Sequence, residues 1–292
     1  PCGEMSRLSF MGGVSKVARK IFRGKFASMP TFDQFQRYLP LLFFVVVLLV
    51  FGQALVNEYA YDGEMLLPRL VEPEPAPLRV LWSPENYGPA TGVQSWRPLT
   101  SLTMMAFDVR LFGLNPALSH ALNLLIHALN GFLLFQLLRR FTGNGAEEKD
   151  DWLALFAAGA FLVHPLVSEV VLCAGFRFDL LALLFLLLTL VVATRFSFPG
   201  SGKEYLVTFL AAPGLFLLGL LAKEVAVAAL VLLPMISFLL EGNRRKSLYL
   251  FLIVAALFGL FFLFWREFQF EGYNREFFGA GGRLLGMANF LV

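Results

Sequence analysis

Several ionisable side chains of this sequence lie beside or within long apolar runs. Asp62 and Glu64 follow one such run, and Arg97, Arg177 and Lys223 come later, next to or within further apolar segments. Ionisable residues are costly in apolar surroundings, where they mark either function or a paired structural contact. Carboxylates can accept protons and cations can hold anions. These residues are therefore the candidates for chemistry, and the elements that carry them decide whether they meet.

The composition is that of a polytopic membrane protein. Of the 292 residues, 58% are hydrophobic and only 15% are charged, and the mean hydropathy is +0.68. Whole segments of about 20 residues carry almost no charge, which is the length that a helix needs to cross a bilayer. A β-barrel would instead show short alternating segments. We therefore predict an all-α bundle of transmembrane helices, and we expect no nucleic-acid partner.

Seven apolar segments are predicted to span the membrane, and an eighth begins near Leu284. The seven are residues 38–57, 118–138, 152–173, 178–195, 205–222, 224–240 and 247–265. The chain then has two parts. Residues 1–37 form a basic segment that is either cytoplasmic or interfacial, and residues 38–292 form the transmembrane domain, with a long outer loop at 58–117.

The basic residues predict the orientation of the helices. Lys and Arg gather before the first span and after the second, fourth and sixth spans, and such ends face the cytoplasm. Nearly all embedded ionisable residues then fall at the opposite, outer ends. This predicted outer cluster comprises Asp62, Glu64, His164, Glu169, Arg177, Asp179, Lys223 and Glu224.

The outer loop contains a predicted helix. In "SWRPLTSLTMMAFDVRLFGLNP", apolar residues recur at helical spacing between Arg97 and Arg110. Pro98 is a favoured residue for the first turn of a helix. We predict an interfacial helix that begins near Pro98, lies along the membrane surface and roofs a cavity.

Several motifs resemble those of a known family. They are "YDGE", "SWRPLTSLT", "GLNPALSHALNLLIHALN", "FLVHPLVSEVVLCAGFRFDLLALLFLLLTL" and "LLAKEVAVAALVLLP", over roughly residues 57–240. In order and spacing they resemble the polytopic protein O-mannosyltransferases that carry tetratricopeptide repeats. The resemblance implies the GT-C class of integral-membrane glycosyltransferases, which take sugar from a polyprenyl-phosphate donor at the extracytoplasmic face.

The resemblance also implies roles for the outer residues. Asp62 would be the general base, and Glu64 would stand in for a second acid, because Gly63 follows Asp62 where members commonly have two adjacent acids. Arg177 and the other two cations would hold the donor phosphate, since Arg is suited to bidentate contacts. The phosphate-binding set is Arg97, Arg177 and Lys223, and the supporting set is His164, Glu169, Asp179 and Glu224.

Structural readings compete with these roles. Arg177 and Asp179 would form a pair that stabilises a bend, Lys223 and Glu224 a pair at a helix end, and Asp62 would be a solvated loop acid. A further set, His120, Asn123, His127 and Asn130, repeats at a spacing of seven and favours a seam of interhelical hydrogen bonds over a metal site.

The predicted function is a glycosyltransferase that moves a sugar such as mannose from a polyprenyl-phosphate donor to a protein or glycan hydroxyl. No metal or cofactor is expected beyond the lipid-linked sugar, since a lipid monophosphate carries little charge to neutralise. The alternative, motivated by Gly63, is a non-catalytic subunit that binds a partner in a larger membrane assembly. A transporter is disfavoured, because the charges collect at one end. No N-x-S/T sequence occurs, and we expect a bacterial inner membrane with a cytoplasmic N-terminus.

Overall fold

The computed structural model describes residues 35–60, 97–141, 148–197, 200–240 and 244–277. The chain divides into two compact units, Pro1–Leu39 and Pro40–Val292, and apart from Leu39 the elements below belong to the second unit. Every regular element in the described ranges is helical. This confirms the predicted all-α class.

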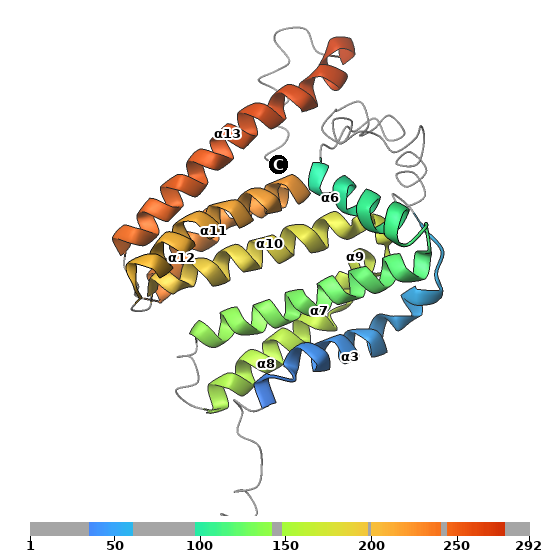
Figure 1. The fold of residues 1–292 in the computed structure, drawn as a ribbon, viewed down its shortest axis with the longest axis horizontal. Coiled ribbons are helices and arrows are strands. Elements are labelled where there is room, and N and C mark those ends of the chain that lie inside the picture. The colour runs from blue at the N-terminus through green and yellow to red at the C-terminus, as the bar shows by residue number, and fades with distance from the viewer. Residues whose placement is uncertain (1–34, 61–96, 142–147, 198–199, 241–243, 278–292) are drawn as a thin grey trace, which may run out of the picture. The chain divides into compact units, whose positions relative to one another are not determined.

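Five helices in the described ranges are long and apolar enough to cross a membrane. All five match predicted spans, and their helices are labelled in Figure 1. They are α3 (Leu39–Phe51) with η1 (Gly52–Val56), α7 (Pro116–Phe141), η5 (Ala174–Phe176) with α10 (Arg177–Ala193), α11 (Gly202–Ala222), and α13 (Arg244–Phe277), whose apolar part is Arg244–Leu263. A shorter apolar helix, Glu224–Leu239, begins with η7 (Glu224–Ala228).

Two predicted spans differ from the structure. The segment 152–173 is not one helix, because α8 (Glu148–Leu162) is followed by η4 (Pro165–Val167) and α9 (Ser168–Leu172), with a bend of 48° between the two halves. Pro165 lacks an N–H donor and disfavours helical geometry at the residue before it, which explains the break. The segment 224–240 begins with η7, and its α12 (Ala229–Leu239) is short. The eighth predicted span lies outside the described residues.

Helix α10 occupies the middle of the bundle, where it packs against α7 and α11, while α8 packs against α7 and α12 against α13 (Figure 1). A buried apolar cluster that includes Leu190, Phe216 and Leu233 joins α10, α11 and α12. Large apolar side chains such as Leu210 and Phe238 are exposed on the outside. Apolar residues both inside and outside are expected of helices surrounded by lipid.

Polar side chains of α7 satisfy backbone carbonyl groups at the breaks that follow α8 and α9. His127 Nε2 lies 3.0 Å from the carbonyl oxygen of Leu162, at the end of α8. Asn123 Nδ2 donates to Cys173 O at 3.1 Å, just after α9. A carbonyl without a partner is costly in lipid, so these bonds permit the breaks. With the bond from Asn130 Nδ2 to Leu180 O at 3.0 Å, they confirm the predicted hydrogen-bonding seam on α7.

The described part of the outer loop is a helical run made of α6 (Pro98–Thr103) and the π-helical η3 (Met104–Leu111). Pro98 occupies the first turn, as predicted. The run stops where Gly113 and Leu114 adopt positive φ angles of 59° and 62°, a conformation that cannot continue a right-handed helix. Asn115 then leads into α7. The run therefore has a defined start and a defined end.

Candidate functional site

Three helix ends meet where the candidate cations lie. They are the start of α6, the start of α10, and the junction between α11 and η7 (Glu224–Ala228), and α6 packs against both α10 and α11. The junction exists because Lys223 has extended backbone, with φ −162° and ψ 143°, which ends α11. The side chains of Arg97, Phe178 and Lys223 thus come together from segments far apart in sequence.

Two ion pairs cross this meeting point. Lys223 Nζ lies 2.6 Å from Asp179 Oδ1, and Arg97 Nη2 lies 3.4 Å from Glu224 Oε1. The predicted structural pairs of Arg177 with Asp179 and of Lys223 with Glu224 do not form, since each residue pairs with a partner on another element. The two positive and two negative side chains lie close together, so their charges cancel.

Both cations also contact one aromatic ring. Arg97 Cζ lies 4.1 Å and Lys223 Nζ 4.7 Å from the centre of the Phe178 ring. Phe178 is only 6% exposed, so the ring is a fixed apolar platform. Cation–π contacts of this length attract a cation without supplying an oxygen ligand. The ring therefore positions two positive charges and leaves hydrogen-bond donors available.

The site can accept an anion. The Arg97 and Lys223 side chains are 18% and 23% exposed, which makes them accessible but partly shielded from water. The contact from Arg97 to Glu224 is long, and the buried Nε of Arg97 has no acceptor among the described residues. A phosphate oxygen could replace the carboxylates as a partner of these cations, because charge-assisted bonds favour Arg and Lys donors.

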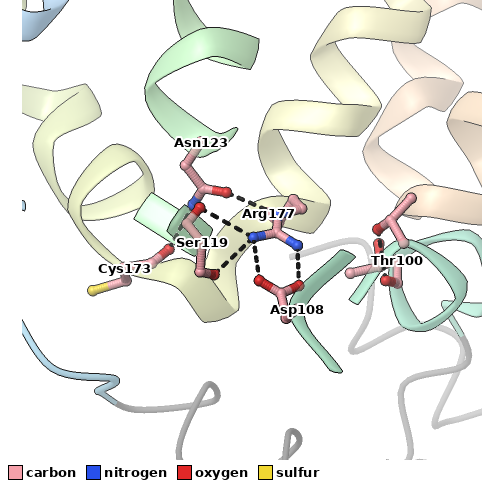
Figure 2. A network of polar contacts seen from close by, with 7 residues as sticks. Thr100, Asp108, Ser119, Asn123, Cys173 and Arg177 are labelled. Atoms are coloured by element: carbon pink, nitrogen blue, oxygen red, sulfur yellow. Dashed lines mark hydrogen bonds and ion pairs between the residues drawn. The ribbon is translucent and has the colours of Figure 1, made fainter. Parts of the chain in front are cut away.

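Arg177 lies beside this site but has different partners. Its side chain is fully buried, and its Nη1 and Nη2 donate to the two carboxylate oxygens of Asp108. Nε donates to Asn123 Oδ1 at 2.9 Å, and Nη2 also donates to Ser119 Oγ at 2.9 Å, as Figure 2 shows. This guanidinium is thus directed into the protein, toward Asp108, rather than toward Phe178.

The remaining predicted residues are placed differently. Asp62 and Glu64 lie outside the described residues. His164 is exposed at the break between α8 and η4, where its Nδ1 accepts from the N–H of Leu166. Glu169 is exposed on α9. Among the described residues, no hydrogen bond or ion pair joins His164 or Glu169 to the cations.

Histidine and carboxylate side chains do not gather in the described ranges in a way that would bind a metal. No group of three His, Cys, Asp or Glu residues in these ranges is placed to hold an ion. His120 Nε2 lies 3.5 Å from the carbonyl oxygen of Glu58, and His127 Nε2 lies 3.0 Å from that of Leu162. Both histidines therefore contact backbone carbonyl groups. That the site works without a metal stays a prediction.

Two residues of the site were not predicted from the sequence. Asp108 is a single acid in the apolar stretch "LTMMAFDVRLFG", and the rule that such acids have a partner would have identified it. Phe178 carries no signal, because it is one of 33 Phe residues. Tyr59 also lies near Asp108, and burial, followed by the charge of Asp108, raises the pKa of its phenol.

The fold and site together define a polytopic α-helical membrane protein with a partly exposed pair of cations at its helix ends. The chain is similar to protein O-mannosyl-transferase TMTC1 of Homo sapiens, with 31% identity over 153 residues, which are 50% of this chain and 17% of the human protein. It is also similar to protein O-mannosyl-transferase TMTC4 of Mus musculus, with 27% identity over 214 residues, which are 68% of this chain and 29% of the mouse protein. The chain thus spans less than a third of the length of these relatives. No protein-family model matches the chain, and no solved structure matches significantly.

Proposed function

We propose that this chain is part of a membrane glycosyltransferase that moves a sugar, with mannose as the first candidate, from a polyprenyl-phosphate donor to a hydroxyl group of a protein or glycan. The observation that carries the proposal is the convergence of Arg97 and Lys223 on Phe178. The similarity to two protein O-mannosyl-transferases supports the same reaction class. The GT-C class and the tetratricopeptide repeats stay predictions.

The carboxylates and the cations have different roles in the proposed reaction. A carboxylate takes the proton of the acceptor hydroxyl while its oxygen attacks the anomeric carbon, and the bond from that carbon to the phosphate oxygen breaks. The departing phosphate gains negative charge, which Arg97 and Lys223 stabilise. Asp62 is the proposed base, with Glu64 as the second acid. Asp62 follows Tyr59 by three residues, and Tyr59 lies near Asp108.

The remaining predicted residues take supporting tasks in this proposal. Asp179 and Glu224 hold Lys223 and Arg97 in place before the donor binds, because each forms an ion pair with one of these cations. Arg177 acts through Asp108 instead of touching the phosphate, since its donors face that carboxylate. His164 and Glu169, exposed near the break between α8 and α9, are candidates for contacts with the acceptor.

The proposed active face is extracytoplasmic. Arg139 and Arg140 lie in the last turn of α7, and basic residues favour the cytoplasmic side. Lys223 follows α11, whose first residues include Lys203, so the cation site is at the opposite end of that helix. The outer helix α6 with η3 would then lie at the membrane surface. A bacterial inner membrane stays a prediction, because the relatives are mammalian proteins.

Sugar transfer from labelled polyprenyl-phosphate mannose, in membranes that contain the chain, tests this proposal. Asp62→Asn keeps the shape of the side chain and removes the base, so transfer should fall by about a hundredfold or more. Transfer should also survive EDTA, because two cations can balance one phosphate diester. Unchanged transfer with Asp62→Asn would refute the base, and loss with EDTA that added Mg²⁺ restores would refute metal independence.

The second candidate is a non-catalytic subunit that binds a partner in a larger membrane assembly. Gly63, where the resembling family has an acid, favours it. The same assay separates the two candidates. A chain that folds, binds the lipid-linked sugar and yet transfers none on its own would support the subunit, and co-purification of a fixed partner would then identify the assembly.

A further inference from the structure

We propose that Asp108 is a positioning residue, which by its ion pair with Arg177 clamps the outer helical run of α6 and η3 so that Arg97 lies beside Lys223. This inference rests on the proposed function only for what the cations bind. The clamp itself concerns only how α6 and η3 are held against α10. Asp108 was not among the residues predicted to support the site.

The two ends of the outer run are held by neighbouring residues of α10. Arg177 contacts Asp108 near the end of the run, and the Phe178 ring contacts Arg97 at its start. A third contact lies near the start, where Thr100 Oγ1 donates to Ala222 O at 3.2 Å. The first turn of α10 and the last residue of α11 thus fix the run at three points.

The contact at Asp108 is the one of the three that joins two buried charged side chains. Asp108 and Arg177 are each 1% exposed as side chains, and the pair is bidentate, with Nη2 at 3.0 Å from Oδ1. Ser119 and Asn123 on α7 satisfy other donors of the same guanidinium (Figure 2). Removing one partner of such a pair leaves a buried charge without compensation, which is strongly unfavourable. Release of the run would then relieve the unpaired charge.

The backbone around Asp108 is fixed as well. Phe112 N–H donates to Phe107 O at 2.7 Å, and Leu114 N–H donates to Asp108 O at 2.7 Å. These bonds and the positive φ angles that follow give the end of the run one conformation. The buried face of the run also carries Met104 and Met105. A shift at Asp108 is therefore transmitted along the run to Arg97, instead of being absorbed locally.

Thiol labelling tests the clamp without any assumption about catalysis. Ser101 is 7% exposed on the same run, so Ser101→Cys, in a chain with Cys2→Ser and Cys173→Ser, should react slowly with a membrane-impermeant maleimide. Asp108→Asn should raise the labelling rate by about tenfold or more, because it breaks a buried charge pair. Thr100→Val removes only one neutral hydrogen bond and should raise the rate by a few-fold.

Asp151→Asn is the matched control. Asp151 also forms a two-point pair with an arginine, since Arg139 Nε lies 2.6 Å from Oδ1 and Arg139 Nη2 lies 3.2 Å from Oδ2. This pair joins α7 to α8, near the last turn of α7. Asp151→Asn should lower the thermal stability without raising labelling at position 101. Equal labelling in both variants would indicate general loosening and overturn the clamp, as would no change with Asp108→Asn.

Steady-state kinetics then test whether the Asp108–Arg177 pair affects binding of the donor. Asp108→Asn should raise the KM for polyprenyl-phosphate mannose by about tenfold with a smaller change in kcat, and Asp151→Asn should leave the KM unchanged. Faster labelling with an unchanged KM would refute the positioning of Arg97 for the donor. A wild-type chain that transfers no sugar would contradict the proposed function, and the labelling comparison alone would then decide the clamp.

Discussion

The substitution Gly131→Ala should destabilise the packing of α7 against the broken α8 segment. A Cβ atom at residue 131 would lie 2.4 Å from Leu162 Cδ2, 2.6 Å from Cγ and 2.9 Å from Cδ1. Leu162 is fully buried at the end of α8, and the clash reaches Cγ as well as the flexible tip. The Leu162 side chain must therefore move as a whole.

The expected magnitude follows from two opposing effects. Overpacking a close-packed contact costs about 1–3 kcal/mol, whereas replacing Gly by Ala in a helix gains roughly 0.5–1 kcal/mol. The two ranges subtract to a net loss of about 0–2.5 kcal/mol, and their midpoints give about 1 kcal/mol. For a chain of this size, a loss of about 1 kcal/mol corresponds to a fall of about 2–4 °C in the midpoint of thermal unfolding, which tryptophan fluorescence in detergent can follow.

Gly159→Ala is the control, because nothing lies within 4 Å of a Cβ atom at that position of α8. It should leave the midpoint unchanged or raise it. A double substitution with Leu162→Ala should cost less than the sum of the single changes, since the smaller side chain removes the clash. If Gly131→Ala proves as stable as Gly159→Ala, the close approach of α7 and α8 is wrong.

Two further predictions concern the contact between the middle of α7 and the end of α8, and the start of the outer loop. His127→Phe keeps ring contacts with Phe51 and Phe161 but leaves Leu162 O without its partner. The free energy of unfolding should therefore fall by about 1–3 kcal/mol, as measured by thermal unfolding. An unchanged stability would mean that this carbonyl does not need the imidazole. Burial raises the pKa of Tyr59 above its ordinary value of 10.0. The stability due to the neutral phenol is then complete below pH 10.0 and is lost as the pH rises through the folded-state pKa. Tyr59→Phe should therefore weaken alkaline destabilisation above pH 10.0. An identical pH profile for both chains would contradict this.

The main elements of the fold could be predicted from composition and periodicity. Apolar runs of about 20 residues give the spans, Pro98 gives the start of the outer helix, and the spacing of Asn123 and Asn130 gives the seam on α7. The break near Pro165 was missed, because hydropathy averaged along the chain is insensitive to a short interruption. Proline at that position was the available signal.

The partners within the site could not be predicted in the same way. Arg177 has an acid two residues away, Asp179, yet its partner is Asp108, which is 69 residues distant. Lys223 similarly bonds to Asp179 and not to its neighbour Glu224. Such choices depend on how the outer run packs across α10, and pairs adjacent in sequence do not face each other on a helix. Local spacing therefore identified the charges but not their contacts.

Binding of polyprenyl-phosphate mannose to the purified chain tests most directly whether the cations at Phe178 hold the donor phosphate. Lys223→Gln should weaken the equilibrium affinity by roughly 10- to 100-fold, because it removes a charge-assisted contact to the phosphate. Lys203→Gln, at the other end of α11, is the matched control and should leave the affinity unchanged. Equal affinities for the wild-type chain and Lys223→Gln would contradict the account.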